Sequence, residues 1–357
     1  MNKSNRGNQQ TAVELTLANY RFHACIGKAC DGAADVYSAR LCLPGASSTN
    51  SCSESPNVAV RVVPLDCEQI ALDEIQFEVL KLRNLSHPSL MPLRASFVTG
   101  SALFMVFPLM DFGSVTDMMS ARFMFGLPEM LIANIIRDVV QAVEYIHRRD
   151  LIHRAIRASH VLVGSHGGAR LSGLRHCASA IRRDQRGHAI HVTMRNATTG
   201  LLWLAPEILR QDLHGYTFKS DIYSIGITAC EMANGFPPFA DMQHMQMLYE
   251  KLRGTTPRLL DMSTLPPDEE THAEQRERSF TPAFHQFTDD CLKGNVQERL
   301  SASELLDHAF LRQLKKSRQN QLPAALDQLI SRVPAASDKT DVHRTTCDQQ
   351  SGVVWSF

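Results

Sequence analysis

The spacing of hydrophobic positions along the chain changes near residue 110. Before that point, short apolar runs separated by polar or glycine-containing segments predict strands at residues 21–27, 36–43, 58–64, 93–99 and 102–108. One segment of this half, residues 67–85, has apolar side chains at roughly helical spacing and predicts a helix with Asp66 as its N-cap. The first part of the chain therefore predicts a sheet that carries one helix.

After residue 110 the apolar side chains recur at every third or fourth position, which is the helical spacing. The clearest stretch is residues 129–147, and further helices are predicted at residues 220–234, 243–252, 284–293 and 301–312. Residues 266–279 are polar and predict a loop. The pattern therefore predicts an α+β protein in which a small β-rich part precedes a larger helical part.

The same pattern predicts where the parts begin and end. Residues 1–17 are polar, which predicts a disordered N-terminal tail. We expect one lobe at residues 18–110 and a second at residues 111–315, followed by a polar C-terminal tail at residues 316–357. The loop at 44–56 is rich in Ser, Gly and Asn, as exposed hairpin connections are. Trp355 and Phe357 end the polar tail, which predicts a docking peptide, and the alternative is that Trp355 folds back onto the helical lobe.

Composition and charge exclude several classes of function. The 37 Lys and Arg residues balance 37 Asp and Glu residues, so the net charge is zero and gives no electrostatic case for nucleic acid or an anionic membrane. No apolar run approaches the roughly 18 to 20 residues that a membrane span needs. The nine cysteines form no C-x-x-C pair, which predicts reduced thiols in a cytoplasmic or nuclear protein.

One loop resembles a protein-kinase catalytic loop that has lost its reactive groups. Residues 151–163 follow the pattern H-R-D-L-x-x-x-N from His153, but Ala155 stands where the aspartate base belongs. His160 replaces the asparagine that holds magnesium, and Gly173 replaces the aspartate of D-F-G. A lone histidine is more often a hydrogen-bonding residue than a metal ligand, so the sequence predicts no metal site.

The β-rich part carries degenerate nucleotide-binding motifs. Residues 26–32 resemble the G-x-G-x-x-G loop over ATP phosphates with Ala29 at its second glycine, and Arg61 replaces the lysine of V-A-I-K. Glu78 has the expected offset to pair with Arg61, and a purely structural pair is the alternative. The predicted nucleotide-binding residues are Ile26, Gly27, Lys28, Val36, Ala59, Arg61, Leu109, Met110 and Leu162.

Residues that stabilise the kinase fold are present further along. Glu207 stands in an A-P-E segment and Arg299 at the position that pairs with it in kinases, while Asp221 is expected to cap the catalytic loop. Groups that hold the fold are therefore kept, whereas groups that move phosphate are missing. This contrast predicts a protein without enzyme activity.

The motifs also predict an active-like shape. Leu174 stands at the position of the D-F-G phenylalanine and is expected to stack with Leu82, Leu93 and His153, the positions of the kinase regulatory spine. Together with the arginine–glutamate pair, this stack predicts an inward position of the helix in the first lobe. ATP is expected to bind without divalent metal, because Lys28 and the arginine can neutralise phosphate charge.

From residue 20 to about residue 314 the chain resembles a eukaryotic protein kinase, and among kinases the STRAD (sterile-20-related adaptor) pseudokinases. The likeness rests on residues 171–175, 219–224 and 226–231 and on the final Trp-Ser-Phe, where the family has Trp-Glu-Phe. The resemblance implies a bilobal kinase fold and ATP as a non-hydrolysed ligand. It further implies an adapter that binds and activates a Ser/Thr kinase of the liver kinase B type, together with a helical-repeat scaffold of the calcium-binding-protein-39 family.

Two alternatives to this adapter function stay open. One is a generic kinase-fold scaffold that binds no nucleotide, and the other is a Ser/Thr kinase with weak residual activity. A melting temperature that nucleotide does not raise would favour the scaffold. A phosphorylation assay beside an intact kinase would separate the enzyme from both non-enzymatic functions.

Overall fold

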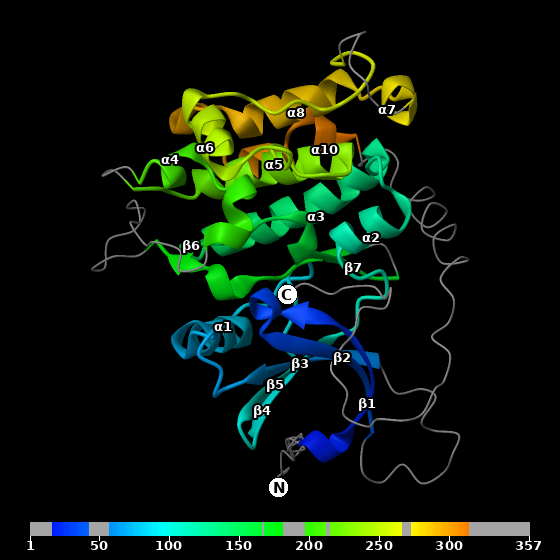
Figure 1. Cartoon of the computed structure of the whole chain (residues 1–357), viewed down its shortest axis with the longest axis vertical. Coiled ribbons are helices and arrows are strands. Elements are labelled where there is room, and N and C mark those ends of the chain that lie inside the picture. The colour runs from blue at the N-terminus through cyan, green and yellow to red at the C-terminus, as the bar shows by residue number, and fades with distance from the viewer. Residues whose placement is uncertain are drawn as a thin grey trace, which may run out of the picture.

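The computed structural model describes residues 16–42, 57–165, 168–180, 197–211, 215–265 and 273–313. Within these ranges the chain forms a β-rich N-lobe and a larger helical C-lobe (Figure 1). The predicted α+β, bilobal fold is therefore confirmed. The predicted N-terminal tail up to residue 15, the loop at 44–56 and the whole predicted C-terminal tail lie outside the described residues. The predicted docking residues Trp355 and Phe357 belong to this C-terminal tail.

The N-lobe is a five-stranded antiparallel sheet in the order β1-β2-β3-β5-β4. Its strands are β1 (Tyr20–Ala29), β2 (Ala34–Leu41), β3 (Asn57–Pro64), β4 (Ala95–Thr99) and β5 (Ala102–Pro108). Side chains alternate between the two faces of a strand, and β3 is buried on both faces. Val58 and Val60 pack in a small cluster on one face, while Ala59 and Val63 join the main core on the other.

Helix α1 (Leu72–Asn84) covers this sheet and begins later than predicted. Asp66 is not its N-cap, because Cys67 and Ile70 close a turn and Ala71 takes the cap position. Acidic side chains in the first turn favour a start at residue 72, since they complement the positive end of the helix dipole. The buried face of α1 carries Ile75, Glu78 and Leu82.

The C-lobe is built around α3 (Glu129–His147), which has the predicted bounds. The apolar face of α3 packs against α5 (Lys219–Asn234), and α5 packs in turn against α8 (Pro282–Leu292). The other helices of the described C-lobe are α2 (Val115–Arg122), α4 (Pro206–Leu209), α6 (His244–Arg253), α7 (Ala273–Glu277), α9 (Ala302–Leu306) and α10 (Ala309–Arg312).

Three parts of the helical pattern differ from the prediction. The predicted helix at 301–312 is two helices, because the His308 side chain accepts a hydrogen bond from the Phe310 N–H and starts a new helix after α9. The predicted loop at 266–279 contains α7. Helix α2 was not predicted, although Ser114 and Asp117 form a capping box at its start.

Two short strand pairs hold the loops at the junction of the lobes. Strand β6 (Leu151–Ile152) pairs with β9 (Ala178–Ser179), and β7 (Val161–Val163) pairs with β8 (Ala169–Leu171). The segment at 153–160 follows β6, and the segment at 172–176 follows β8, so the pairings place both at this junction. The candidate functional site therefore lies between the lobes.

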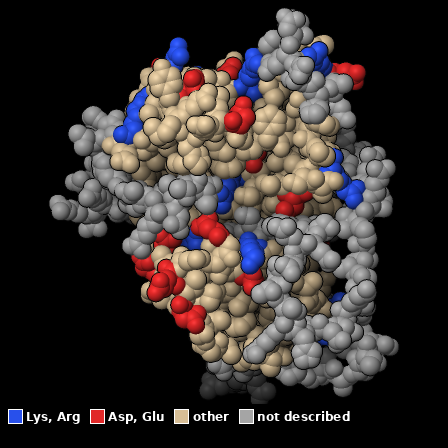
Figure 2. Space-filling view, in the orientation of Figure 1, with Lys and Arg blue, Asp and Glu red and all other residues tan. Residues whose placement is uncertain are grey.

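The surface of the N-lobe is acidic around α1. Figure 2 shows acidic side chains gathered over this helix, and the exposed acids there include Asp66, Glu68 and Asp73. A surface of this charge repels polyanions and favours partners with basic groups. Over the described residues, no helix combines the length and the apolar character that a membrane crossing requires.

Candidate functional site

Asp221 of α5 holds the loop at 153–160 in place. Its carboxylate accepts hydrogen bonds from the backbone N–H groups of His153 and Arg154, both at 2.8 Å, and lies 2.8 Å from Nε2 of His147. Burial raises the pKa of Asp221, but the hydrogen bond and charge of His147 outweigh it, so this pKa lies below its usual value. Asp221 thus makes the cap that the resemblance implies, and it supports Arg154 in a left-handed conformation (φ +65°).

Ala155, at the position of the base, contributes only its backbone. Its carbonyl oxygen lies 2.6 Å from Nδ1 of His160, and Nε2 of the same ring lies 3.0 Å from Nη2 of Arg157. A carbonyl can only accept and a guanidinium can only donate, so these partners assign His160 a neutral ring with its proton on Nδ1. Burial and the charge of Arg157 hold the pKa of His160 well below 6.5. Neither ring nitrogen has a lone pair left for a metal.

Gly173 lies directly against His160. Its φ is +83°, and a Cβ atom added at this position would lie 2.7 Å from Nδ1 of His160. The imidazole therefore fills the space that an aspartate side chain would need. The described residues include no group of three or more His, Cys, Asp or Glu side chains that could hold a metal ion. The residues at this site do not fit magnesium.

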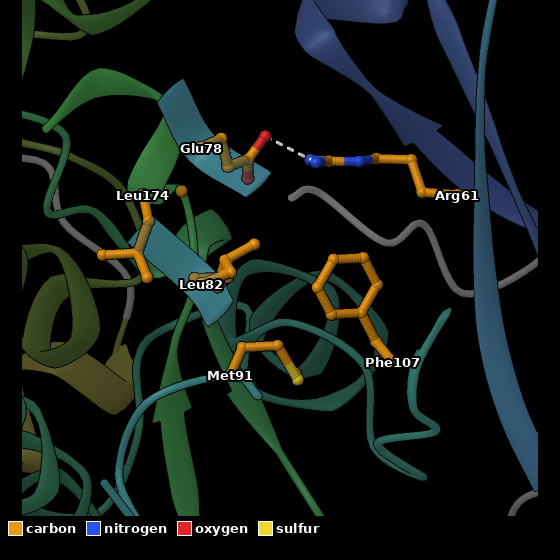
Figure 3. Close-up of a pocket in the computed structure, with 8 residues that line it drawn as sticks. Arg61, Glu78, Leu82, Met91, Phe107 and Leu174 are labelled. Carbon is orange, nitrogen blue, oxygen red and sulfur yellow. Dashed lines mark hydrogen bonds and ion pairs between the residues drawn. The ribbon is translucent and has the colours of Figure 1, made fainter. Parts of the chain in front are cut away.

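Arg61 is buried between the sheet and α1. Its Nη2 lies 2.5 Å from Oε2 of Glu78 and 2.9 Å from the sulfur of Met105, and its guanidinium carbon lies 5.5 Å from the centre of the Phe107 ring. Burial opposes the charge of Arg61, but Glu78 outweighs it and the pKa of Arg61 is raised. Figure 3 shows the two side chains pointing toward each other, and both line a small cavity. This ion pair ties α1 to β3 in an inward position.

Leu174 lines the same cavity, with Leu82 and Met91 as apolar neighbours (Figure 3). Of the residues predicted to stack with Leu174, Leu82 lines this cavity, whereas Leu93 is half-buried against the main core and does not line it. His153 is fully buried, and its Nε2 lies 2.9 Å from the carbonyl oxygen of residue 172, one residue before Gly173. The apolar side chains behind the cleft are thus continuous from α1 to the segment at 172–176.

The other predicted nucleotide-binding residues lie on β1, β2, β3, β7 and the segment after β5. Lys28 is exposed, and its ammonium pairs with Asp35 at 3.2 Å. Gly27 faces Val36 in the β1–β2 register. The side chains that would form apolar walls around an adenine ring are buried or half-buried, and they are Ile26, Val36, Ala59, Leu109, Met110 and Leu162. Their character fits an adenine ring.

The sequence did not reveal the contacts at the tip of the β1–β2 loop. Asp31 pairs with Arg175 at 2.7 Å, and Nε of Arg175 lies 3.9 Å from a carboxylate oxygen of Glu74 on α1. The tip of such a loop covers the phosphates in kinases, so a carboxylate here does not fit a triphosphate in this conformation. The only sequence signal was one acidic and one basic residue, 144 positions apart.

A second set of contacts that the sequence did not predict lies between the loop at 153–160 and α5. Glu231 of α5 accepts hydrogen bonds from the indole N–H of Trp203 at 2.7 Å and from the backbone N–H of Ala158 at 3.1 Å. Burial raises the pKa of Glu231 to about 7, against these hydrogen bonds and the charge of Arg157. Glu231 therefore ties the degenerate catalytic loop to the segment that precedes the A-P-E motif.

Glu207 and Arg299 form a buried, two-pronged ion pair. Nη1 of Arg299 lies 2.6 Å from Oε1 of Glu207, and Nη2 lies 2.9 Å from Oε2. The Nε group of Arg299 also donates to the carbonyl oxygen of Lys293 at 2.7 Å. These contacts join α4 to the loop before α9, which is the contact that the resemblance implies.

Comparison with known proteins agrees with this geometry. A family model described as the protein kinase domain matches residues 47–311. The fold, the loops at the junction of the lobes and this match define a protein kinase domain.

Among curated proteins, the chain is similar to STE20-related kinase adapter proteins. It is 40% identical to the alpha protein of Rattus norvegicus over 298 residues, which cover 75% of this chain and 76% of the relative. The alpha protein of Homo sapiens is 39% identical, with 75% and 69% covered. The beta protein of Homo sapiens is 34% identical over 363 residues, with 93% and 83% covered. The chain belongs to the STE20-related kinase adapter family, as its sequence motifs predicted.

Proposed function

We propose that the chain is a catalytically inactive adapter that binds and activates a Ser/Thr protein kinase of the liver kinase B type. The observation that carries this proposal is the contact between His160 and Gly173. It removes two metal ligands at once and fills their space, while the ion pairs that stabilise the fold are kept. The relatives of this chain are named kinase adapters, which supports a partner kinase.

The inactive site follows from what phosphoryl transfer requires. That reaction depends almost entirely on positioned groups and on the charge of bound metal ions. Loss of a general base alone removes about 10²- to 10⁴-fold of the rate. Here the base position is Ala155, and neither His160 nor Gly173 can hold magnesium. The kinase shape therefore serves recognition in this proposal.

The inward position of α1 supports a role as an activator. The Arg61–Glu78 ion pair stands where active kinases have the ion pair that positions this helix, and Leu174 and Leu82 line the cavity beside it. An adapter with this shape offers its partner the surface of an active kinase. In this proposal the cytoplasm or nucleus is the site of action, and a helical-repeat scaffold of the calcium-binding-protein-39 family binds the tail at Trp355 and Phe357.

ATP is the proposed ligand of the cleft, bound without divalent metal and not hydrolysed. The apolar walls around Val36, Ala59 and Leu162 support adenine binding. ATP at a hundred times its dissociation constant should stabilise the fold by about 2.7 kcal/mol. Thermal unfolding with ATP, in the presence and absence of EDTA, measures this. A shift that requires magnesium, or no shift in either condition, contradicts this proposal.

Reconstitution tests the adapter function. Purified liver kinase B and the scaffold are assayed on a peptide substrate with and without this chain, and the chain should raise the rate. A kinase-dead form of the partner should abolish all phosphorylation, because this chain contributes none. Arg61→Met should reduce activation by releasing α1, whereas the exposed control Arg312→Gln should not. Absence of binding and of activation favours the generic scaffold, and phosphorylation with the dead partner favours the residual kinase.

A further inference from the structure

The tip of the β1–β2 loop has an unusual backbone. Cys30, Asp31 and Gly32 form one 3-10 turn in which all three residues have positive φ, at 53°, 56° and 96°. L residues rarely adopt this region, and it persists where surrounding contacts hold it. Within this turn Cys30 is only 4% exposed, and the Asp31 side chain is 20% exposed although its backbone is at the surface.

The contact that holds the tip is the ion pair of Asp31 with Arg175. The Arg175 side chain is 7% exposed, and its guanidinium lies between the Asp31 carboxylate at 2.7 Å and Glu74 of α1 at 3.9 Å. Burial raises the pKa of Asp31, but Arg175 outweighs it, and His176 and Arg157 lower this pKa further. Asp31 therefore carries a negative charge that faces several basic groups.

We propose that Asp31 is an internal anion that closes the β1–β2 loop onto Arg175 and competes with a polyphosphate for the basic end of the cleft. The carboxylate and a phosphate have the same sign, so they cannot share this partly buried space without strong repulsion. Binding of a polyphosphate then requires the tip to leave Arg175. The closed arrangement of loop, α1 and the segment at 172–176 is held without nucleotide.

This proposal deepens the proposed nucleotide binding and rests on it for one measurement. Asp31→Asn removes the charge and keeps a residue that tolerates positive φ, so the turn itself is preserved. Glu68→Gln is the matched control, because it removes one charge from an exposed position of the same lobe. ATP binding to the full chain, measured by calorimetry without divalent metal, should tighten at least tenfold in Asp31→Asn. Glu68→Gln should bind within twofold of the wild type.

A second measurement does not depend on nucleotide. Amide hydrogen exchange at residues 27–34 of the unliganded chain should be at least tenfold faster in both Asp31→Asn and Arg175→Gln. The double variant should exchange no faster than the faster single variant, since both changes break the same Asp31–Arg175 contact. Exchange that stays at the wild-type rate in the single variants overturns the closure.

The two measurements separate the possible failures. ATP binding in Asp31→Asn that equals or falls below the wild type overturns the competition, provided that the wild type binds. Absence of binding in every variant contradicts the proposed nucleotide binding and the competition, while the exchange data still decide whether Asp31 closes the loop. Inorganic triphosphate serves as a second probe, and tighter binding of this ion in Asp31→Asn assigns the effect to phosphate charge and not to adenine.

Discussion

The imidazole of His160 and the Cα atom of Gly173 are in such close contact that a Cβ atom at position 173 would lie 2.7 Å from Nδ1 of the ring. The ring cannot move away freely, because Ala155 and Arg157 engage its two nitrogens. Two positions at which the chain departs from the kinase motifs are therefore coupled through space. Restoring the kinase residue at only one of these two positions should therefore lower the stability of the fold.

Gly173→Asp should destabilise the protein by about 2–5 kcal/mol, the sum of overpacking and of a non-glycine residue at positive φ. Combined with His160→Asn, which shortens the opposing side chain, the loss should be smaller. Urea unfolding of the single and double variants measures the difference. Gly168→Asp is the control, since nothing lies within 4 Å of a Cβ there. It should stay within about 0.5 kcal/mol of the wild type. A Gly173→Asp variant as stable as the control would contradict the close packing.

The chain should show no phosphotransferase activity. Incubation with labelled ATP, magnesium or manganese and generic protein substrates should give no signal above a heat-killed control, because Ala155, His160 and Gly173 supply neither base nor metal ligand. A catalytically intact kinase runs beside it as the positive control. Turnover that survives repurification and disappears when Arg61 is changed would show that the chain is an enzyme.

Removal of one partner of the Glu207–Arg299 pair should destabilise the fold strongly. Arg299→Gln leaves a buried carboxylate without its charge partner, and the expected loss is about 3–5 kcal/mol. The exposed pair of Arg312 with Asp307 provides the control, and Arg312→Gln should cost roughly 0–1 kcal/mol. Chemical denaturation of both variants makes the comparison. Equal losses would mean that the buried pair adds nothing beyond a surface pair.

Mild acid should destabilise the protein in part through His160. The pKa of this histidine lies well below 6.5 in the fold, so the unfolded chain binds a proton that the folded chain does not, and stability falls as the pH drops below about 6.5. Glu231 acts in the opposite direction between its usual pKa and about 7, so the net pH dependence is a sum over groups.

The contribution of His160 is isolated by a difference. Between pH 7.5 and 5.5 the wild type should lose about 1.4 kcal/mol more stability than His160→Asn does. Thermal unfolding at both pH values measures the two losses. His244→Asn, at an exposed position, should lose as much as the wild type. Identical losses in His160→Asn and the wild type would show that this ring does not titrate on unfolding.

The C-terminal tail should bind the helical-repeat scaffold. A synthetic peptide of residues 346–357 is expected to bind it, since Trp355 and Phe357 offer two aromatic anchors. Changing both to alanine should weaken binding at least tenfold. A full-length double variant that binds as well as the wild type would show that the tail is not the anchor. Ser356, where the family has glutamate, would then be the first residue to change.

The sequence predicted those parts of the fold that depend on local patterning. The regular apolar spacing along 129–147 gave the bounds of α3, and the buried run around Val58 and Ala59 gave β3. The start of α1 was missed because the turn that Cys67 and Ile70 close comes before it. The break between α9 and α10 was missed because a single capping contact of His308 decides it.

Site positions defined by motifs, such as Ala155 and Gly173, could be assigned from sequence because kinase motifs have fixed spacing. The contacts that these residues and their neighbours make in the folded chain could not be predicted in the same way. The ring of His160 against Gly173 and the pairing of Asp31 with Arg175 depend on the relative placement of loops, which is a property of the folded chain. No local pattern encodes it.

The Arg61–Glu78 ion pair has a consequence for affinity. A partner that recognises only one conformer of a protein binds with an apparent dissociation constant increased by the inverse of that conformer's population. Arg61 and Glu78 hold α1 inward through a contact within the chain, and this contact favours the inward conformer. Such an adapter works as a preorganised template: its partners bind a shape that already exists, and the strength of binding depends on the fit of the two surfaces.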